Sequence, residues 1–319
     1  MGIACGLPGA IEVRARSAAR DRVRAHERLY ACVRACVRAC VHMSVRACAH
    51  ACAWVRACAV NMPASVTLVD IDPQEVARQL TLLMWAHFEK LSESDFLDLA
   101  WTKAKLHHKA VCLRDMRKLQ KRIFWVAATL IISPEELSVR QRAICACAQW
   151  AWHCFQHHDF FTACTVFYAI QCSAVFRMQK TRAGLKTGLK ERLKSQDLLS
   201  NMQDHLDEIG VCMDSNKNFK TYRERLETTP QPVLPFLDIF LTDLVYIDDN
   251  ADTVEDGLIN FRKRQLEVRV IKGIMHFQTV PFNFVKVDKV VELFEAVQEK
   301  DPDTDLYKLS QEREPRLVE

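Results

Sequence analysis

The sequence is poor in glycine, with 8 among 319 residues, and this scarcity limits the loops that the chain can form. The glycines of AGLKTGLKER, Gly184 and Gly188, lack the G-x4-G-K-[ST] order, so the sequence predicts no nucleotide binding through a phosphate-binding loop. A nucleophile elbow of the G-x-S-x-G type is also missing. Apolar residues recur mostly every three or four positions, which together with the scarce glycine predicts an all-helical, all-α fold.

Cysteine pairs of the C-x2-C type are missing too, although the chain contains 14 cysteines, and zinc sites usually show such pairs. Six cysteines instead recur nearly every four residues in ACVRACVRACVHMSVRACAHACAWVRACAV, residues 31–60. Because the bases CGTG, repeated and read in triplets, encode Arg-Ala-Cys-Val, this repeat is typical of a translated simple-sequence tract. We therefore expect residues 1–62 to form a disordered low-complexity leader. The alternatives are a metal site, a disulfide framework, or an arginine-rich arm that binds RNA or membrane.

Beyond the leader, acidic residues slightly outnumber basic ones. The first 60 residues carry ten arginines against three acids, a charge of +7, whereas the whole chain carries +4, so the remainder carries −3. This balance does not suggest a nucleic-acid partner for the main domain. Residues 63–319 are long enough for one large domain with a substantial core. Seven cysteines remain there, mostly in apolar segments, which predicts buried free thiols.

Two segments carry the residue pattern of a helix start. Asp72 precedes Pro73, which suits the first helical position. Ser133 precedes Pro134, with Glu136 three residues after the predicted cap. Further helices are expected at 160–175, 190–209, 217–227, 236–246, 258–278 and 288–298.

A histidine cluster, HCFQHHD, is the one candidate metal site outside the leader. His153 and His157 would lie one helical turn apart, with Cys154 and His158 adjacent to them. No distant second pair of ligands is identifiable. We therefore expect a half-buried helix end here, and neither a metal nor a cofactor.

An unusual charge pattern follows in PVLPFLDIFLTDLVYIDDNADTVEDGLINFRKRQLEVRVIKGIMHFQTVPFNF, residues 232–284. An apolar helix runs into paired acids, turns, and returns as a strongly basic amphipathic helix that begins near Phe261. This order predicts a protruding helical hairpin. The alternative is a plain core hairpin with charged ends.

The segments DPQEVARQLTLL, SNKNFKTYRERL, PFLDIFLTDLVYIDD and LINFRKRQ, closed by FQTVPFNF, resemble in this order the catalytic domain of Ras-family guanine-nucleotide exchange factors, over about residues 66–300. The resemblance implies that the hairpin enters a Ras-like small GTPase of Ras, Rap or Ral type. There it would move the first switch region, disturb the magnesium and phosphate site, and release GDP without covalent chemistry or a cofactor. It also implies a cytoplasmic protein recruited to the membranes where the GTPase resides.

The resemblance assigns catalytic positions to four residues of the hairpin. Phe236 matches an aromatic that grips and packs, and Val245 matches an apolar position that faces the magnesium site. Asp248 and Asp249 match the two acids of a usual Glu-Glu pair, of which the second can accept a hydrogen bond from the phosphate loop. The positions that the resemblance implies for partner binding or hairpin packing are Asp159, Phe160, Phe219, Tyr222, Leu241, Leu244, Asn260 and Phe261.

Several residues depart from the family pattern. Asp238 stands where glycine is usual and adds a charge to the hairpin helix. Asp249 is one methylene shorter than the usual Glu, and Ala251 loses a possible hydrogen bond. Asn250 replaces a turn glycine, and Asn tolerates the left-handed backbone that such a turn can require. These departures leave an alternative function open, a scaffold that binds the GTPase with weak or no exchange activity.

Overall fold

The computed structural model describes residues 67–187, 202–254, 257–297 and 305–315. The chain divides into two units, Met1–Val66 and Thr67–Glu319, and the predicted leader lies outside the described residues. The described part of the second unit consists of helices and loops, with two isolated bridges at Asp159–Leu234 and Thr253–Ile259. The prediction of an all-α fold is confirmed.

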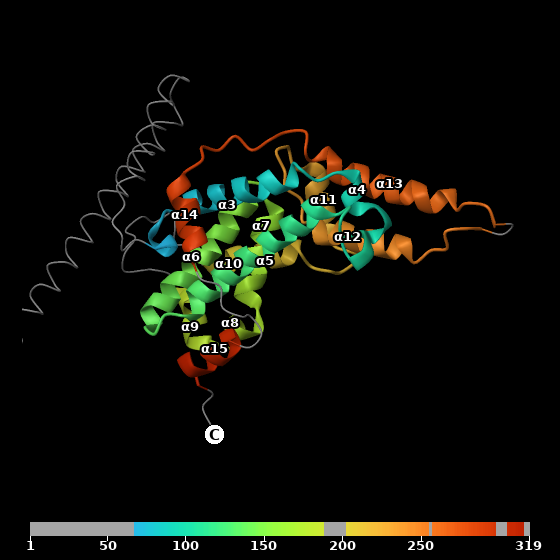
Figure 1. Ribbon diagram of the computed structural model, residues 1–319. Coiled ribbons are helices and arrows are strands. Elements are labelled where there is room, and N and C mark those ends of the chain that lie inside the picture. The colour runs from blue at the N-terminus through green and yellow to red at the C-terminus, as the bar shows by residue number, and fades with distance from the viewer. Residues whose placement is uncertain (1–66, 188–201, 255–256, 298–304, 316–319) are drawn as a thin grey trace, which may run out of the picture. The chain divides into compact units, whose positions relative to one another are not determined.

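The helices follow one another with mostly short connections, and Figure 1 labels most of them. In chain order they are η1 (Leu68–Asp70), α3 (Pro73–Phe88), α4 (Glu93–Phe96), η2 (Leu97–Leu99), η3 (Ala104–Leu106), α5 (Val111–Ile132), α6 (Leu137–Gln156), α7 (Phe160–Gln171), α8 (Ser173–Phe176), α9 (Gln179–Thr187), α10 (Met202–Cys212), α11 (Lys220–Thr228), α12 (Leu237–Asp248), α13 (Phe261–His276), α14 (Asp288–Ala296) and α15 (Tyr307–Arg313).

The core of this unit lies around α6, which contacts α3, α5, α7, α9 and α10. Trp150 and Phe155 of α6 are almost completely buried, and Phe155 packs edge-on against Phe160 of α7. The helices α9 and α6 approach each other closely at Gly184. A Cβ atom at this position would lie 2.9 Å from the Cβ atom of Gln141. Gly184 therefore serves helix packing and not phosphate binding.

One predicted helix start is confirmed and the other is wrong. Asp72 caps α3, since its carboxylate accepts a 3.1 Å hydrogen bond from the N–H of Gln74. Ser133 instead ends α5, where its N–H donates to the carbonyl of Thr129. The helix α6 starts after Glu136, because Ser133 keeps the helical conformation of the α5 end, whereas an N-cap residue takes a non-helical one.

The other predicted boundaries differ from the structure by a few residues. The helix expected at 160–175 is α7, which ends at Gln171 before the short α8, and the helix expected at 258–278 is α13. Part of the helix expected at 190–209 lies outside the described residues, and α10 begins at Met202.

Buried free thiols are confirmed for the described residues. None of the seven described cysteines is in a disulfide, and only two of them, Cys112 and Cys172, are not fully buried. Burial raises the pKa of Cys145 to about 11, so this thiol stays protonated and unreactive at neutral pH. Among the described residues, no helix has both the length and the apolar character that a membrane span requires.

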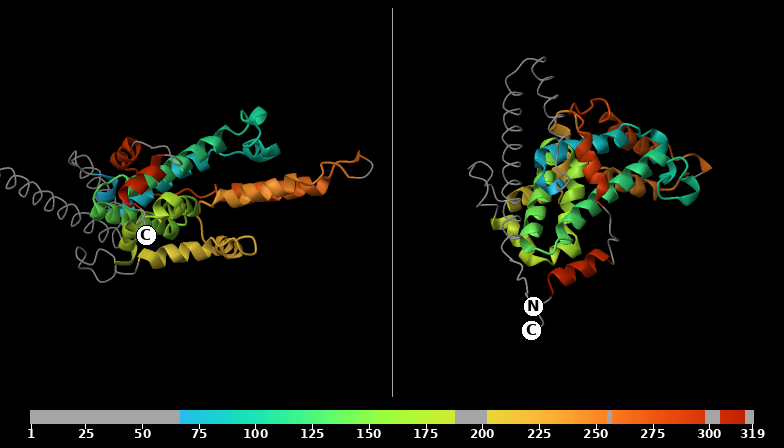
Figure 2. Two further views of the ribbon diagram at one scale, coloured as in Figure 1. Left: turned by 90° about the horizontal axis from the view of Figure 1, so that it is seen from below. Right: turned by 60° about the vertical axis from the view of Figure 1, so that its left-hand side comes forward.

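The helices α12 and α13 form the predicted hairpin. They pack against each other and extend together away from the body of this unit (Figure 1 and Figure 2). Short elements at residues 93–106 lie beside the hairpin, with η2 in contact with α12 and α4 in contact with α13. These elements therefore support the hairpin from one side, and Lys103 among them pairs with Asp248 at the end of α12.

Candidate functional site

Aromatic side chains hold the root of the hairpin. Phe236, the N-cap residue of α12, is 5% exposed, and its ring centroid lies 6.0 Å from those of Phe161 and Tyr168. The N–H of Phe236 donates a 2.7 Å hydrogen bond to the Tyr222 hydroxyl. The Tyr222 ring packs edge-on against Phe160 with centroids 5.6 Å apart. The first turn of α12 is thereby fixed to α7 and α11.

A buried carboxylate lies beneath this root. Asp159 caps α7 and accepts 2.8 Å hydrogen bonds from the N–H of Thr162 and the hydroxyl of Thr81. Burial raises the pKa of its carboxyl group to about 6. Asp159, Phe160 and Tyr222 are all completely buried. These three side chains therefore support the hairpin from beneath, and none of them reaches the surface.

The inner face of α12 is apolar and is braced by an ion pair. Leu241 and Leu244 are 5% and 2% exposed. Arg223 of α11 donates to both carboxylate oxygens of Asp243, at 3.0 and 2.9 Å. Phe219 precedes α11 in a left-handed conformation, with φ of 56°, and is half-buried. The helix α12 is therefore held along its length from the α11 side.

The outward face of α12 is a single stripe from root to tip. Asp238, Thr242, Val245 and Asp249 follow one another at intervals of four, three and four residues, so they lie on the same side of the helix. Val245 is 37% exposed, and the Asp249 carboxylate is exposed with no ion pair or side-chain hydrogen bond to the described residues. We call these four residues the α12 face.

A buried lysine fixes the tip of the hairpin. The Lys263 ammonium, in a side chain only 2% exposed, donates to the carbonyls of Asp248 and Asn250 at 2.9 and 2.8 Å and to the Asp252 carboxylate at 2.9 Å. The Asp248 carboxylate forms ion pairs with Lys103 at 3.3 Å and Lys263 at 3.6 Å. Asp248 is thus occupied within the chain, whereas Asp249 is not.

The start of α13 also shapes this tip. Asn260 caps α13 and donates a 2.8 Å hydrogen bond to the carbonyl of Ala251. Phe261 is 68% exposed, so its side chain is open to a partner. Asn250 does not adopt a left-handed backbone, and Gly257, with φ of 73°, provides that conformation instead.

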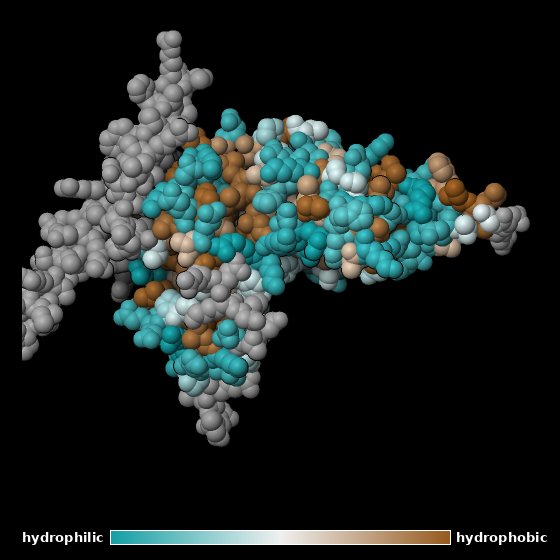
Figure 3. Space-filling view, in the orientation of Figure 1, coloured by the Kyte–Doolittle hydropathy of each residue, from teal (hydrophilic) through white to brown (hydrophobic). Residues whose placement is uncertain are grey.

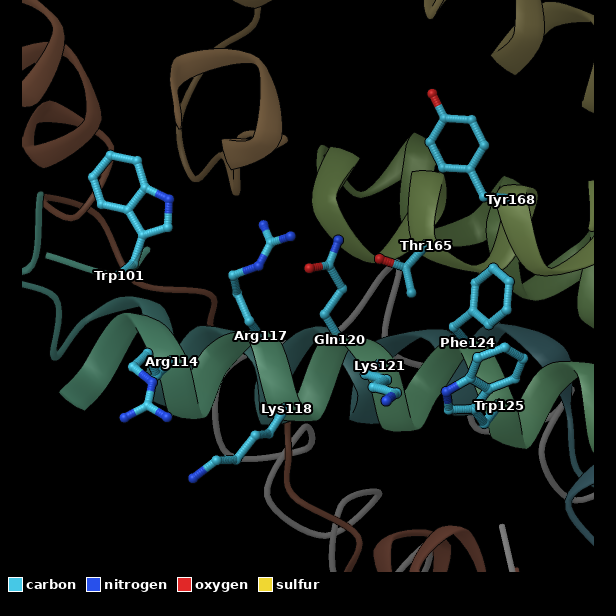
Figure 4. Close-up of a pocket in the computed structure, with 10 residues that line it drawn as sticks. All are labelled: Trp101, Arg114, Arg117, Lys118, Gln120, Lys121, Phe124, Trp125, Thr165 and Tyr168. Atoms are coloured by element: carbon cyan, nitrogen blue, oxygen red, sulfur yellow. The ribbon is translucent and has the colours of Figure 1, made fainter. Parts of the chain in front are cut away.

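A basic and aromatic groove of about 640 Å³ lies at the foot of the α12 face, between α5 and α7. Figure 4 shows Arg117 and Gln120 pointing from α5 toward the side on which Tyr168 stands, whereas Arg114 and Lys118 point the opposite way. The lining residues include no carboxylate. The residues that line the groove are Trp101, Arg114, Arg117, Lys118, Gln120, Lys121, Phe124, Trp125, Thr165 and Tyr168.

The groove and the hairpin are joined by direct contacts. Asp238 of the α12 face forms an ion pair with Arg117 and accepts a 3.1 Å hydrogen bond from the Gln120 amide. Phe236 packs against Tyr168, another lining residue. Burial raises the pKa of Tyr168 to about 12, so its hydroxyl remains a hydrogen-bond donor at neutral pH. Groove and α12 face therefore form one continuous surface.

Sequence analysis missed the groove because it predicted no helix over residues 111–132. The helix α5 begins after Ala110 without a side-chain cap, so the residue pattern of a start is absent. The spacing of Leu113, Met116 and Ile123, all buried, is helical. That period alone would have found α5, and with it Arg117.

The histidine cluster has the environment of a packed helix end. The rings of His153 and His157 are stacked with centroids 6.5 Å apart. Burial lowers the pKa of His157 to about 4, so this ring is neutral at physiological pH. Among the described residues, no group of three or more His, Cys, Asp or Glu side chains is placed to hold a metal ion.

Comparison with known proteins gives one family. The RasGEF domain model matches residues 75–265. Ras guanine nucleotide exchange factor A of Dictyostelium discoideum is 30% identical over 270 residues, which are 80% of this chain and 42% of the relative. Ras-specific guanine nucleotide-releasing factor 1 of Mus musculus is 29% identical over 244 residues, 76% of this chain and 18% of the relative. The chain thus spans less than half the length of these relatives.

Proposed function

The chain belongs to the RasGEF domain family, and we propose on this premise that it accelerates GDP release from a Ras-family small GTPase. The proposed catalytic element is the hairpin of α12 and α13, about residues 235–278. Exchange involves no covalent step. The chain acts by binding the nucleotide-free GTPase more tightly than the GDP-bound form, since only contacts that are stronger in the open state lower the barrier to release.

The observation that carries this proposal is the continuity of the groove with the α12 face. Asp238 contacts Arg117 at the foot of the face, while Val245 and Asp249 are exposed farther along it. A GTPase seated in the groove would therefore meet Val245 and Asp249 with another part of its surface. The groove can hold one part of the GTPase while the α12 face contacts another part, and this arrangement suits the opening of a nucleotide site.

The two exposed side chains have different roles in this proposal. Val245 brings no oxygen ligand, so next to a bound magnesium ion it disfavours the ion. Asp249 brings an unpaired carboxylate, which competes with a nucleotide phosphate and accepts hydrogen bonds from the emptied phosphate loop. Asp248 is already paired with Lys103 and Lys263, and it shapes the tip. Phe236 fixes the root of the hairpin through its hydrogen bond to Tyr222.

The remaining predicted residues divide between support and contact. Asp159, Phe160, Tyr222, Leu241 and Leu244 are buried and support the hairpin. We assign partner contact to exposed or half-buried side chains at the two ends of the surface. These are Phe219 beside α11 and Phe261 at the tip, with Asn260 holding the tip in place.

The proposed partner also determines location. Within the family, the partner is a GTPase of Ras, Rap or Ral type, and we propose that the chain works in the cytoplasm and reaches membranes through this GTPase. The groove is basic and aromatic, but the α12 face that continues it carries the carboxylates of Asp238 and Asp249, which would repel the phosphates of a nucleic acid. No nucleic-acid partner is proposed.

The test is release of a fluorescent GDP analogue from Ras, Rap and Ral-type GTPases in the presence of the full chain. We expect acceleration on at least one of them. Asp249→Ala should lower that acceleration by about ten- to a hundredfold, because a charge-assisted hydrogen bond in the open state contributes on the order of 1.5–3 kcal/mol.

Tyr246→Ala is the matched control. Tyr246 is 69% exposed on the same helix but lies about 100° away from Val245 around the helix axis, so its loss should leave release nearly unchanged. If no GTPase is accelerated although its nucleotide-free form binds, the chain is a scaffold and the proposal of exchange activity is refuted. Absence of binding to every nucleotide-free GTPase would remove the partner class as well.

A further inference from the structure

The groove already holds a carboxylate that belongs to the chain itself. Asp238 forms an ion pair with Arg117 through one oxygen and accepts a 3.1 Å hydrogen bond from the Gln120 amide through the other. Both partners line the groove. The side chains of Arg117 and Asp238 are 43% and 32% exposed, so an incoming molecule can reach this pair.

The charge of the groove favours a carboxylate at this place. Lys121 lies four residues after Arg117 on α5 and the lining includes no acid, whereas Arg114 and Lys118 point the opposite way (Figure 4) and Lys118 is paired with Asp115. Like charges at three- and four-residue spacing destabilise one another. Asp238 offsets this repulsion, and it lies in the first turn of α12, where the helix dipole also favours a negative charge.

The ion pair is not needed as a mechanical brace for α12. The root is held by the N–H of Phe236 on the Tyr222 hydroxyl and by the Phe236 ring between Phe161 and Tyr168. Partly exposed ion pairs stabilise proteins little. We therefore expect the Asp238–Arg117 ion pair to affect what the groove binds more than it affects the stability of the fold.

We infer that Asp238 determines partner specificity by occupying Arg117 and Gln120, so that a GTPase must present its own carboxylate-bearing segment to displace it. This inference rests on the proposed function. A neutral or basic segment gains nothing from the groove while Asp238 holds these two donors. An acidic segment exchanges one carboxylate for another, so the internal competitor weakens even the correct partner while it excludes incorrect ones.

The test compares the full chain with Asp238→Ala, Arg117→Ala and the double variant in binding to nucleotide-free Ras, Rap and Ral-type GTPases. We expect Asp238→Ala to bind an acidic partner about two- to fivefold more tightly, as for release of one exposed ion pair. The gain should appear in the association rate and shrink with added salt. The double variant should lose the gain, because no freed arginine remains.

Glu224→Ala is the control, because it removes an exposed carboxylate of α11 that pairs with Lys220 outside the groove. It should give no gain. Unchanged or weaker binding by Asp238→Ala, or a gain that survives in the double variant, overturns the inference. The wild-type chain reports separately on the proposed function: exchange by the wild type without a gain in Asp238→Ala refutes the competitor alone. Tighter binding by Asp238→Ala that is lost in the double variant supports the competitor.

Discussion

Lys263→Ala is expected to lower the acceleration of GDP release by about thirtyfold or more while the helical core stays folded. The Lys263 ammonium donates to two carbonyls and one carboxylate of the hairpin tip, and each hydrogen bond from a charged group contributes on the order of 1.5–3 kcal/mol. Without it, the three acceptors lose the donor that they share and the turn that carries Asp249 loosens. A loss of about 2 kcal/mol in positioning corresponds to roughly thirtyfold in rate.

The readouts are GDP release and amide hydrogen exchange over residues 245–262. Exchange protection should fall there and persist in α6 and α7, since the contacts of Lys263 are local. Lys272→Ala is the matched control, because Lys272 is exposed on the same helix. Full activity of Lys263→Ala, or equal losses in both variants, would show that the fixed tip has no role in exchange.

The positions of the hairpin helices were predictable from sequence because their charge and apolar patterns are local. A run of apolar residues, a cluster of acids and a basic amphipathic segment follow each other within about fifty residues. The Asp72 cap was predictable for the same reason, since the capping bond to Gln74 spans two residues. Where the Ser133 pattern misled, the preceding helix extended to Ile132 and tertiary packing overrode the local preference.

The groove could not be predicted because its contacts are long-range. Asp238 and Arg117 are 121 residues apart in sequence, and neither residue type indicates the other. From sequence alone, the charge of Asp238 is only a departure from the family pattern. The structure shows that it pairs with Arg117. In the same way, the Asp159 carboxylate accepts a hydrogen bond from Thr81, 78 residues away in sequence, and sequence spacing does not reveal this pairing.

Asp159→Asn is expected to stabilise the protein above about pH 4, by about 3 kcal/mol at pH 8 and about half of that at pH 5. Burial raises the pKa of Asp159 from 3.8 to about 6 in the folded state, and each pKa unit corresponds to about 1.36 kcal/mol. Because the folded pKa is the higher one, the carboxyl group favours folding most below pH 3.8, and that contribution is lost as pH rises through 6.

Asparagine removes this loss, since its amide stays neutral at every pH. Its oxygen can still accept from the N–H of Thr162, and its NH2 group can donate to the hydroxyl of Thr81, the two present partners of Asp159. Urea unfolding of both proteins at pH 5 and pH 8 measures the difference. Asp95→Asn removes a second buried carboxylate. It shows whether the change in unfolding free energy between pH 5 and pH 8 is specific to Asp159. A pH-independent difference for Asp159→Asn would mean that the hydrogen bonds from Thr81 and Thr162 fully offset burial, and that this carboxylate costs the fold nothing.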